Sequence, residues 1–406
     1  MTDPIGDVFL SYRHSHQDLA AALDQSLREH GIPIWRDVRD VGPDPLQEQI
    51  IEDLDDPELT GGIVLVTEDV VDSEIILKVE LPRLYDRWQA DDEFFVVVVL
   101  ASDVGYDDAK RILAESPSPY DFSQWYMESL KINADTDGPP AFDAVVTAVL
   151  ERRLDAIHNT LGDEEPIECS LDTYDPPAYP ESLGLTIDWS HHFDEALPAA
   201  SVWNGRLHPA LTTVINQLQQ TAPGRSLRFR GSTHLPAAFT TGHALQTTRG
   251  IDAGWMQPDG TDGLARWTNT RGTDESGLHA SMERRDVTGS DLAVFASISD
   301  DVTSEVGRTK SSLPMFNGIL TLALDVEQPP KLTASQAAHA ATVFRQEIRD
   351  ALNEFSNTST VHLFMAGPAG LAFLFGQQTN TLPPIQTYVL STADGPRVYQ
   401  PAIKLQ

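Results

Sequence analysis

The chain has 406 residues, which is too long for one ordinary hydrophobic core and predicts two or three domains. Its 61 acidic and 28 basic residues give a formal net charge of −33, and only six of the basic residues are lysines. Such a surface repels polymeric nucleic acid and anionic membranes, so neither is expected as a partner. It is typical of a halophilic protein adapted to molar salt, although an acidic protein from an ordinary cytosol is the alternative.

Cysteine content and hydropathy predict a soluble, cytoplasmic protein. The lone Cys169 cannot form an internal disulfide, and it excludes a cysteine-rich metal site. Residues 1–4 do not begin a signal peptide. The longest apolar run, 94–101, is shorter than the roughly 20 residues needed to span a bilayer. No metal site is predicted.

The first element is a strand, a loop and a helix. Residues 8–10 form a short apolar run without Pro or Gly, which predicts a buried strand. Ser15 and Asp18 then have the spacing of a capping box, and apolar residues recur at helical spacing until His30. Because ligands bind at the carboxyl ends of strands in open α/β sheets, residues 11–14 should lie at a ligand-binding edge.

The first domain continues as alternating strands and helices to about residue 154, which predicts an α/β fold with helices on both faces of a parallel sheet. Further strands are expected at 32–36, 63–66 and 94–100, and helices at 46–54 and 75–88. The continuous β-branched run 96–99 is typical of a central strand. The charged, turn-rich segment 36–45 predicts an exposed loop that can act as a lid or contact surface.

Several short motifs in this domain carry a resemblance when they are taken in order. They are Asp7-Val8-Phe9-Leu10-Ser11-Tyr12, then Gly31-Ile32-Pro33-Ile34-Trp35-Arg36-Asp37 with Gly42, Pro43 and Leu46, then Ile63-Val64-Leu65-Val66-Thr67 with Ser73 and Glu80-Leu81. As an ordered set they resemble the boxes of a TIR domain over roughly the first 130 residues. The resemblance implies a flavodoxin-like parallel sheet.

The same resemblance implies a catalytic residue. Many bacterial and archaeal TIR domains cleave NAD with a Glu in the helix after the third strand, and Glu80 matches that position. The chain departs from the family pattern with Ile75 and Ile76 where Trp-Cys or Trp-Val is common, and with Pro82 two residues after the Glu. A carboxylate beside the ribose would bind its hydroxyls and offset the developing oxocarbenium charge while nicotinamide leaves. NAD would then be a substrate, and no cofactor is expected.

Pro82 bears on how Glu80 is presented, because it has no N–H and should kink or restart the helix there and turn Glu80 toward the pocket. Without the resemblance, the expected interpretation of Glu80 is a solvated helix residue that pairs with a neighbour such as Arg83. The expected remaining walls of the NAD pocket are Phe9, Ser11, Tyr12, Arg13, Trp35 and Asp37. For Phe9 a core position is as good an interpretation as ligand contact.

Two acidic, Pro-rich stretches, 163–166 and 174–180, predict a semi-rigid linker. The expected limits are therefore 1–155 for the first domain, 156–180 for the linker and 181–406 for the second domain. The second domain alternates twice. One series has strands at 185–189, 226–230 and 252–256 with helices at 210–219 and 235–245, and the other has strands at 291–297, 319–324, 361–365 and 385–390 with helices at 302–309, 335–355 and 371–377.

Two such halves would face each other across a cleft lined by the strand ends at 189–191, 231–234, 297–300 and 366–369. Three of these lead into helix N-termini, which favour anions. Trp255 and Trp267 could stack on bases, with a core role at least as good an interpretation, and Arg230, Arg271 and Lys310 could pair with phosphates.

The motifs of this part also carry a resemblance. Arg230-Gly231-Ser232, Ala237-Ala238-Phe239 with Gly242, His362-Leu363-Phe364-Met365-Ala366-Gly367-Pro368, Leu371-Ala372, Leu374-Phe375-Gly376 and Tyr388 resemble the SAVED domain. The resemblance implies a tandem of two CARF-like, Rossmann-like halves that senses cyclic oligonucleotides made by a partner nucleotidyltransferase in anti-phage defence. The expected ligand-binding residues are Ser190, Arg230, Gly231, Ser232, Thr233, Trp255, Ser297, Ser299, Lys310, Gly367, Pro368 and Ala369.

The two resemblances together imply an NAD⁺ hydrolase that is switched on by a cyclic oligonucleotide, with a cyclic trinucleotide as the expected ring. Binding would assemble TIR domains into an oligomer or filament, and NAD depletion would serve defence (the CBASS type of system). Two alternatives stay open: a TIR adaptor without catalytic activity, and a TIR enzyme that makes a cyclic ADP-ribose signal.

Overall fold

The computed structural model describes residues 6–36, 43–101, 103–117, 119–130, 141–162, 165–175, 184–194, 196–258, 263–270, 272, 274–285, 289–309, 313–324, 332–391 and 396–406. The chain divides into two compact units. Unit 1 comprises Met1–Cys169, Glu181–Asp188 and Asn216–Pro223, and unit 2 comprises Ser170–Pro180, Trp189–Ile215 and Gly224–Gln406. Within the described residues, every helix is too short or too polar to cross a bilayer.

The first sheet is five-stranded and parallel, in the order β2-β1-β3-β4-β5. Its strands are β1 (Val8–Ser11), β2 (Ile34–Trp35), β3 (Gly61–Val66), β4 (Phe95–Leu100) and β5 (Tyr126–Ser129). Strands β3 and β4 are buried throughout, which confirms the central position predicted from the β-branched run. The expected parallel α/β sheet is therefore present.

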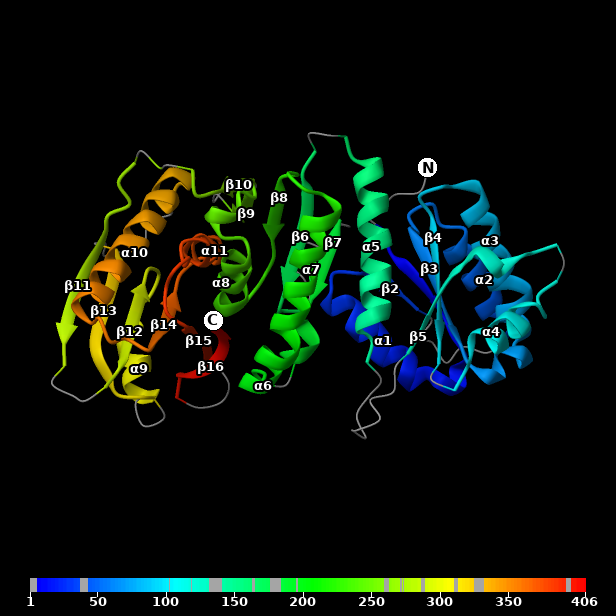
Figure 1. The fold of residues 1–406 in the computed structure, drawn as a ribbon, viewed down its shortest axis with the longest axis horizontal. Helices are drawn as coiled ribbons and strands as arrows, with labels where there is room; N and C mark the ends of the chain where they lie inside the picture. The colour runs from blue at the N-terminus through cyan, green and yellow to red at the C-terminus, as the bar shows by residue number, and fades with distance from the viewer. Residues whose placement is uncertain are drawn as a thin grey trace. The chain divides into compact units, whose positions relative to one another are not determined.

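Helices cover both faces of this sheet. They are α1 (Gln17–Glu29), α2 (Pro43–Leu54), α3 (Leu81–Ala90), α4 (Tyr106–Leu113) and α5 (Asp143–Thr160). Apolar residues of α2, α3 and α4 share one core with β1, β3 and β4, and Figure 1 shows these three helices on one side of the sheet and α1 and α5 on the other. The sequence analysis missed α4, β5 and α5.

The start of α1 differs from the prediction. A 3₁₀ turn, His14–His16, precedes the helix, and the N-cap residue is His16, whose side chain makes no capping hydrogen bond. The expected capping box is wrong because the Ser15 hydroxyl donates to Asp69 Oδ2 at 2.5 Å and does not cap the helix. A tertiary partner has taken the hydroxyl that the local pattern assigned to the helix.

The expected helix 75–88 is divided beside Glu80. A π-helical turn, Ile76–Glu80, precedes α3, and Pro82 occupies the first turn of α3. Proline is tolerated there because the first N–H groups of a helix have no intrahelical acceptor. The predicted restart of the helix at Pro82 is confirmed.

Two further sheets follow, and both are mixed. One has the order β10-β9-β8-β6-β7, with β6 (Ile167–Asp172), β7 (Leu185–Asp188), β8 (Leu227–Arg230), β9 (Ala253–Pro258) and β10 (Leu264–Trp267). The other has the order β11-β13-β12-β14-β15-β16, with β11 (Leu278–Arg284), β12 (Asp291–Ser297), β13 (Phe316–Leu324), β14 (Thr360–Ala366), β15 (Ile385–Ser391) and β16 (Val398–Leu405). Its inner strands are parallel, while β11 and β16 are antiparallel edges.

The helices of this part are α6 (Ala200–Val202), α7 (His208–Thr221), α8 (Leu235–Ala244), α9 (Thr303–Thr309), α10 (Ala334–Glu354) and α11 (Ala369–Gln377). Helix α10 begins with a capping box, in which Thr333 Oγ1 accepts from Gln336 N and Gln336 Oε1 accepts from Thr333 N. The expected start of this helix at about residue 335 is confirmed. The second α/β part is thus present as predicted.

Strand β6 lies inside the expected linker 156–180. The sequence analysis missed it because the strand stands between two acidic, Pro-rich stretches, although its apolar residues Ile167, Cys169 and Leu171 occupy alternate positions as in a strand. Strands β10, β11 and β16 were missed too. The limits given for the domains and the linker stay predictions.

Helices α8 and α11 cross at two glycines. A Cβ added to Gly242 would lie 1.9 Å from the Phe373 oxygen, and one added to Gly376 would lie 2.0 Å from the Phe239 oxygen. The contacts are reciprocal, and both helices carry the sequence Ala-Phe-x-x-Gly, at 238–242 and 372–376. The crossing therefore relates the two helices by a local pseudo-two-fold, as expected for two similar halves.

Candidate functional site

Glu80 and Ser11 meet at the carboxyl edge of the first sheet. Ser11 is the last residue of β1 and Glu80 the last residue of the π turn. The Ser11 hydroxyl donates to Glu80 Oε2 at 2.5 Å, with Ser11 1% and Glu80 6% exposed. Arg83, the alternative partner for Glu80, has its Nε 3.6 Å from Asp55 Oδ1. The carboxylate expected to act on the ribose is thus held at the edge where α/β proteins bind ligands.

Phe9 and Trp35 stack at the same edge, with ring centroids 5.1 Å apart and an interplanar angle of 14°. Phe9 is buried in the core, whereas Trp35 is half-buried and packs against that core. The structure therefore favours the core interpretation of Phe9, and the role of Trp35 in the NAD pocket stays a prediction. Tyr12 is half-buried, and Asp37 lies outside the described residues.

Asp69 joins the loop after β1 to the loop after β3. It accepts from Ser15 at 2.5 Å and from Thr67 Oγ1 at 2.6 Å, and it pairs with Arg13 Nε at 3.5 Å and His16 Nε2 at 3.3 Å. Burial alone would raise the pKa of Asp69, but these hydrogen bonds and the neighbouring cations lower it to about 2. Arg13, an expected NAD contact, is therefore oriented by a carboxylate that the sequence analysis did not single out.

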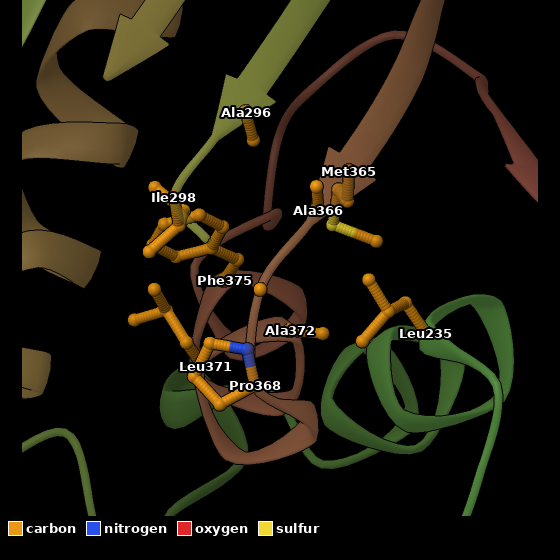
Figure 2. A pocket seen from close by; sticks show the side chains of 10 residues that line it. Leu235, Ala296, Ile298, Met365, Ala366, Pro368, Leu371, Ala372 and Phe375 are labelled. Carbon is orange, nitrogen blue, oxygen red and sulfur yellow. The ribbon is translucent and has the colours of Figure 1, made fainter. Parts of the chain in front are cut away.

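A second candidate site lies in unit 2. A small pocket is lined by Leu235, Ala296, Ile298, Met365, Ala366, Gly367, Pro368, Leu371, Ala372 and Phe375. It lies at the carboxyl ends of β12 and β14 and beside the starts of α8 and α11. Figure 2 shows Leu235 and Met365 approaching each other on one side and Ile298 and Leu371 on the other. Gly367 and Pro368 were expected ligand residues, whereas the expected strand end 189–191 contributes none of the lining.

The loop 231–234 begins with a glycine that no other residue can replace without strain. Gly231 has φ +147°, and a Cβ there would lie 2.1 Å from the Leu171 oxygen. The Ser232 amide donates to Asp172 Oδ1 at 2.8 Å, and the His234 amide donates to Thr173 Oγ1 at 2.8 Å. The loop was expected to line an anion-binding cleft, but these two of its amides are bonded to Asp172, the last residue of β6, and to Thr173 after it.

His234 is stacked between two rings at the start of α8. Its ring lies 4.4 Å from Tyr174 at 15° and 4.5 Å from Phe193 at 14°. Thr173 Oγ1 lies 2.8 Å from its Nδ1. Burial lowers the pKa of His234 to about 4, so it is neutral at pH 7. Sequence analysis placed His234 on the loop but missed this stack, because its members are far apart in the chain.

The end of β12 is tied to its neighbours. Ser297 Oγ accepts from the Val302 amide at 3.2 Å, and the Ser299 amide donates to the Ala366 oxygen at 3.1 Å. Both expected ligand residues therefore hold the loop between β12 and α9. The carboxylate of Asp300 lies 3.7 Å from Arg397 Nη1 beside them.

Trp255 belongs to the core. It is 1% exposed, pairs with Trp267 across β9 and β10, and packs 5.8 Å from the Phe373 ring. An adenine could not reach its face, so the expectation that Trp255 stacks on a base is wrong in this structure. A Cβ on Gly370 would lie 3.1 Å from Trp255 Cδ1, so the start of α11 packs directly on this indole.

The other expected ligand residues are distributed as follows. Arg230 is half-buried at the end of β8, Thr233 is half-buried in the following loop, Ser190 begins the 3₁₀ turn Ser190–His192, and Ala369 is the first residue of α11. Lys310 and Arg271 lie outside the described residues. The structure thus brings together Gly367, Pro368 and the loop after β12 at the pocket, and it removes Trp255 from it.

The fold defines an α/β protein in which a flavodoxin-like five-stranded parallel sheet is followed by two mixed α/β sheets. Residues 8–132 match the TIR domain, and residues 210–405 match the SMODS-associated and fused to various effectors sensor domain, SAVED. The chain is a TIR domain fused to a SAVED domain.

The chain is also similar to a known relative and to solved structures. CD-NTase-associated protein 4 of Acinetobacter sp. (strain ATCC 27244 / 9458) is 24% identical over 213 residues, which are 51% of this chain and 43% of that protein. The match therefore spans less than half of the relative. The Acinetobacter baumannii Cap4 SAVED/CARF-domain containing receptor is 13% identical in each of two complexes. For the complex with 2'3'3'-cAAA the TM-score is 0.49, and the match covers 91% of this chain and 86% of the receptor. For the complex with 3'3'3'-cAAA the TM-score is 0.48, and the match covers 97% of this chain and 99% of the receptor.

Proposed function

We propose that this protein is an NAD⁺ hydrolase that is switched on when its SAVED domain binds a cyclic oligonucleotide. The observation that carries the proposal is the buried Glu80 carboxylate, held by Ser11 at the carboxyl edge of the TIR sheet. A carboxylate with low exposure acts on a developing positive charge more strongly than one in water, because the surrounding dielectric is low.

The reaction needs few groups. The C–N bond between ribose C1' and the nicotinamide nitrogen breaks, and its electron pair neutralises the pyridinium ring as nicotinamide leaves. Glu80 would bind the ribose hydroxyls and offset the charge on the oxocarbenium-like ring. Water then adds at C1' and releases a proton, which gives ADP-ribose. Trp35 and Tyr12 would form the walls, with Arg13, oriented by Asp69, and Asp37 at the rim.

The activator is proposed to be a cyclic trinucleotide at the pocket of unit 2. Support comes from the SAVED match and from the related receptor, which was solved with 2'3'3'-cAAA and 3'3'3'-cAAA. The apolar lining suits the faces of nucleobases, and phosphates would lie over Gly367, Pro368 and Ala369, where the start of α11 favours negative charge.

Activation is proposed to proceed by assembly. A bound ligand would let one molecule contact the next in a head-to-tail manner, which builds open oligomers or filaments and brings TIR domains together. The net charge of −33 opposes such contacts without ligand. In the cell, NAD depletion would then serve anti-phage defence of the CBASS type. Domain limits of 1–155 and 181–406, with a linker between them, are part of this proposal.

Sedimentation with and without 3'3'3'-cAAA tests assembly. Larger species should appear only with the ligand, and NAD cleavage per molecule should fall on dilution. An activated protein that stays monomeric at undiminished turnover would refute assembly while leaving catalysis intact.

Substitution of Glu80 tests catalysis. Glu80→Gln keeps the shape and removes the charge, so ligand-triggered nicotinamide release should fall by roughly a hundredfold or more. Glu74→Gln is the matched control, because Glu74 lies just before the same turn, is exposed and pairs only with Lys78 among the contacts of the described chain. A Glu80→Gln protein that retains a tenth of wild-type turnover removes Glu80 from the catalytic role.

A further inference from the structure

The π turn that carries Glu80 leaves one backbone carbonyl without its ordinary donor. In an α-helix the Leu81 N–H would donate to the Leu77 oxygen four residues back, but here it donates to the Ile76 oxygen five residues back. The next donor in this π register would be residue 82, which is proline and has no N–H. Leu77 is buried, so its carbonyl needs a donor from elsewhere in the protein.

Ser116 supplies that donor. It follows α4, is 9% exposed, and its hydroxyl donates to the Leu77 oxygen at 2.7 Å. The Ser116 amide is bonded in turn to the Leu113 oxygen at 3.1 Å, which fixes the hydroxyl to the end of α4. An unsatisfied buried carbonyl is costly, so this hydrogen bond favours the π register over alternatives that would rotate the turn.

We infer that Ser116 is a positioning residue for Glu80: its hydroxyl satisfies the Leu77 carbonyl and so holds the π turn that points Glu80 at Ser11. The turn ends at Glu80, and each residue of a helix is rotated about 100° from the next, so a change of register redirects this side chain. Isolated π turns inside helices occur often at functional sites. The inference rests on the proposed function, because it assigns Ser116 a role in NAD cleavage.

The first test compares Ser116→Ala with Thr60→Val. Thr60 is also a buried hydroxyl of unit 1 that donates to a backbone oxygen, that of Asp7 at 3.1 Å, but it lies before β3 at the opposite edge of the sheet. In the presence of 3'3'3'-cAAA, Ser116→Ala should lower kcat about tenfold with KM for NAD within about twofold, since small misplacements of a reacting group are costly. Thr60→Val should change the melting temperature and leave kcat alone.

Hydrogen exchange supplies a readout that does not depend on NAD cleavage. The amides at 79–81 should exchange about tenfold faster in Ser116→Ala and at the wild-type rate in Thr60→Val. Wild-type exchange and wild-type kcat in Ser116→Ala would overturn the inference. A wild-type protein that releases no nicotinamide would overturn the proposed function, and exchange would then still decide whether Ser116 holds the turn.

A double variant tests the route through the Leu77 carbonyl. Pro82→Ala introduces an N–H at the position from which a π register would donate to that carbonyl. In Ser116→Ala/Pro82→Ala, kcat should recover most of the loss seen in Ser116→Ala alone. A double variant as slow as the single one would contradict the assignment of the Leu77 carbonyl as the group through which Ser116 acts.

Discussion

The edge of the TIR sheet and the pocket of the SAVED domain are built in opposite ways. At the TIR edge, charged and hydroxyl groups are preassembled: Ser11 is bonded to Glu80, and Asp69 gathers Arg13 and Ser15. The SAVED pocket is lined by apolar side chains, and the nearby loop amides of Ser232 and His234 are bonded to β6. Under the proposed function, the difference means that Glu80 is held in place for catalysis, whereas the SAVED pocket would have to exchange internal hydrogen bonds for ligand contacts.

The glycine crossing of α8 and α11 offers the strongest way to break the sensor while sparing the TIR edge. Gly242→Ala places a Cβ where the Phe373 oxygen lies, so the SAVED domain should lose roughly 3 kcal/mol or more of unfolding free energy. Binding of 3'3'3'-cAAA should fall with it, because the pocket is built on both helices. Calorimetric melts and titrations measure the two effects.

Gly307→Ala is the matched control, since it lies in α9 and a Cβ there meets nothing within 4 Å. It should be neutral or stabilise the protein by about 0.5–1 kcal/mol. If Gly242→Ala melted and bound ligand like Gly307→Ala, the close crossing would not hold the pocket together.

The Ser11 hydroxyl offers a way to weaken the TIR edge while sparing the sensor. Ser11→Ala removes the donor to Glu80, so kcat for NAD cleavage should fall about tenfold to a hundredfold, while ligand affinity of the SAVED domain stays unchanged. Ser123→Ala, at an exposed serine of the same domain, should match wild type. Steady-state kinetics at saturating activator measure this effect. An unchanged kcat would show that NAD cleavage does not need the hydrogen bond from Ser11 to Glu80.

A substitution of Asp69 tests whether the TIR edge contributes to NAD binding separately from the chemical step. Asp69→Asn removes the charge that orients Arg13, so KM for NAD should rise about tenfold while kcat changes less. Asp108→Asn, at an exposed helix residue paired with Arg111, is the control. A loss confined to kcat would assign Asp69 to the chemical step instead.

The sequence predicted the elements that carry strong local patterns. The buried strands β3 and β4, the helix α10 with its capping box and the restart at Pro82 all follow from apolar runs, caps and proline chemistry. The TIR motifs predicted that Glu80 lies in the helix after the third strand, and it is the last residue of the π turn before α3. Local patterning sufficed at these places because the residues that decide the structure are neighbours in the chain.

The rest depends on partners far apart in the chain. Ser15 was expected to cap α1 but bonds Asp69, which is 54 residues away. Trp255 was expected at the ligand and lies in the core against Phe373. The stack of Tyr174, His234 and Phe193 has no local pattern at all. The repeat Ala-Phe-x-x-Gly in α8 and α11 is the one signal that could have placed the helix crossing from sequence.

A pH dependence of stability is also expected in the SAVED domain. Burial, chiefly, lowers the pKa of His234 and of His243 to about 4 in the folded protein, against about 6.5 when unfolded. Between those values the unfolded chain binds protons that the folded chain does not, so the unfolding free energy should fall as pH drops from about 6.5 to about 4. Melts across this range should show the SAVED transition moving down by several degrees.

His234→Phe tests this assignment, because a phenyl ring can keep the stack between Tyr174 and Phe193 without titrating. The pH dependence should become shallower in the variant. Asp69 does not confuse the result, since its pKa of about 2 places its loss of stability between about 3.8 and 2. If the unfolding free energy of His234→Phe depended on pH as steeply as that of the wild type, groups other than His234 would cause the pH dependence.

Ligand-dependent nicotinamide release by the intact chain tests the central claim most directly. The assay belongs in molar KCl, because ions screen the self-repulsion of a chain with a net charge of −33. Release should be absent without activator and begin when 3'3'3'-cAAA or 2'3'3'-cAAA is added, with ADP-ribose as the second product. Release that ignores both trinucleotides, or NAD that stays intact in their presence, would contradict the account.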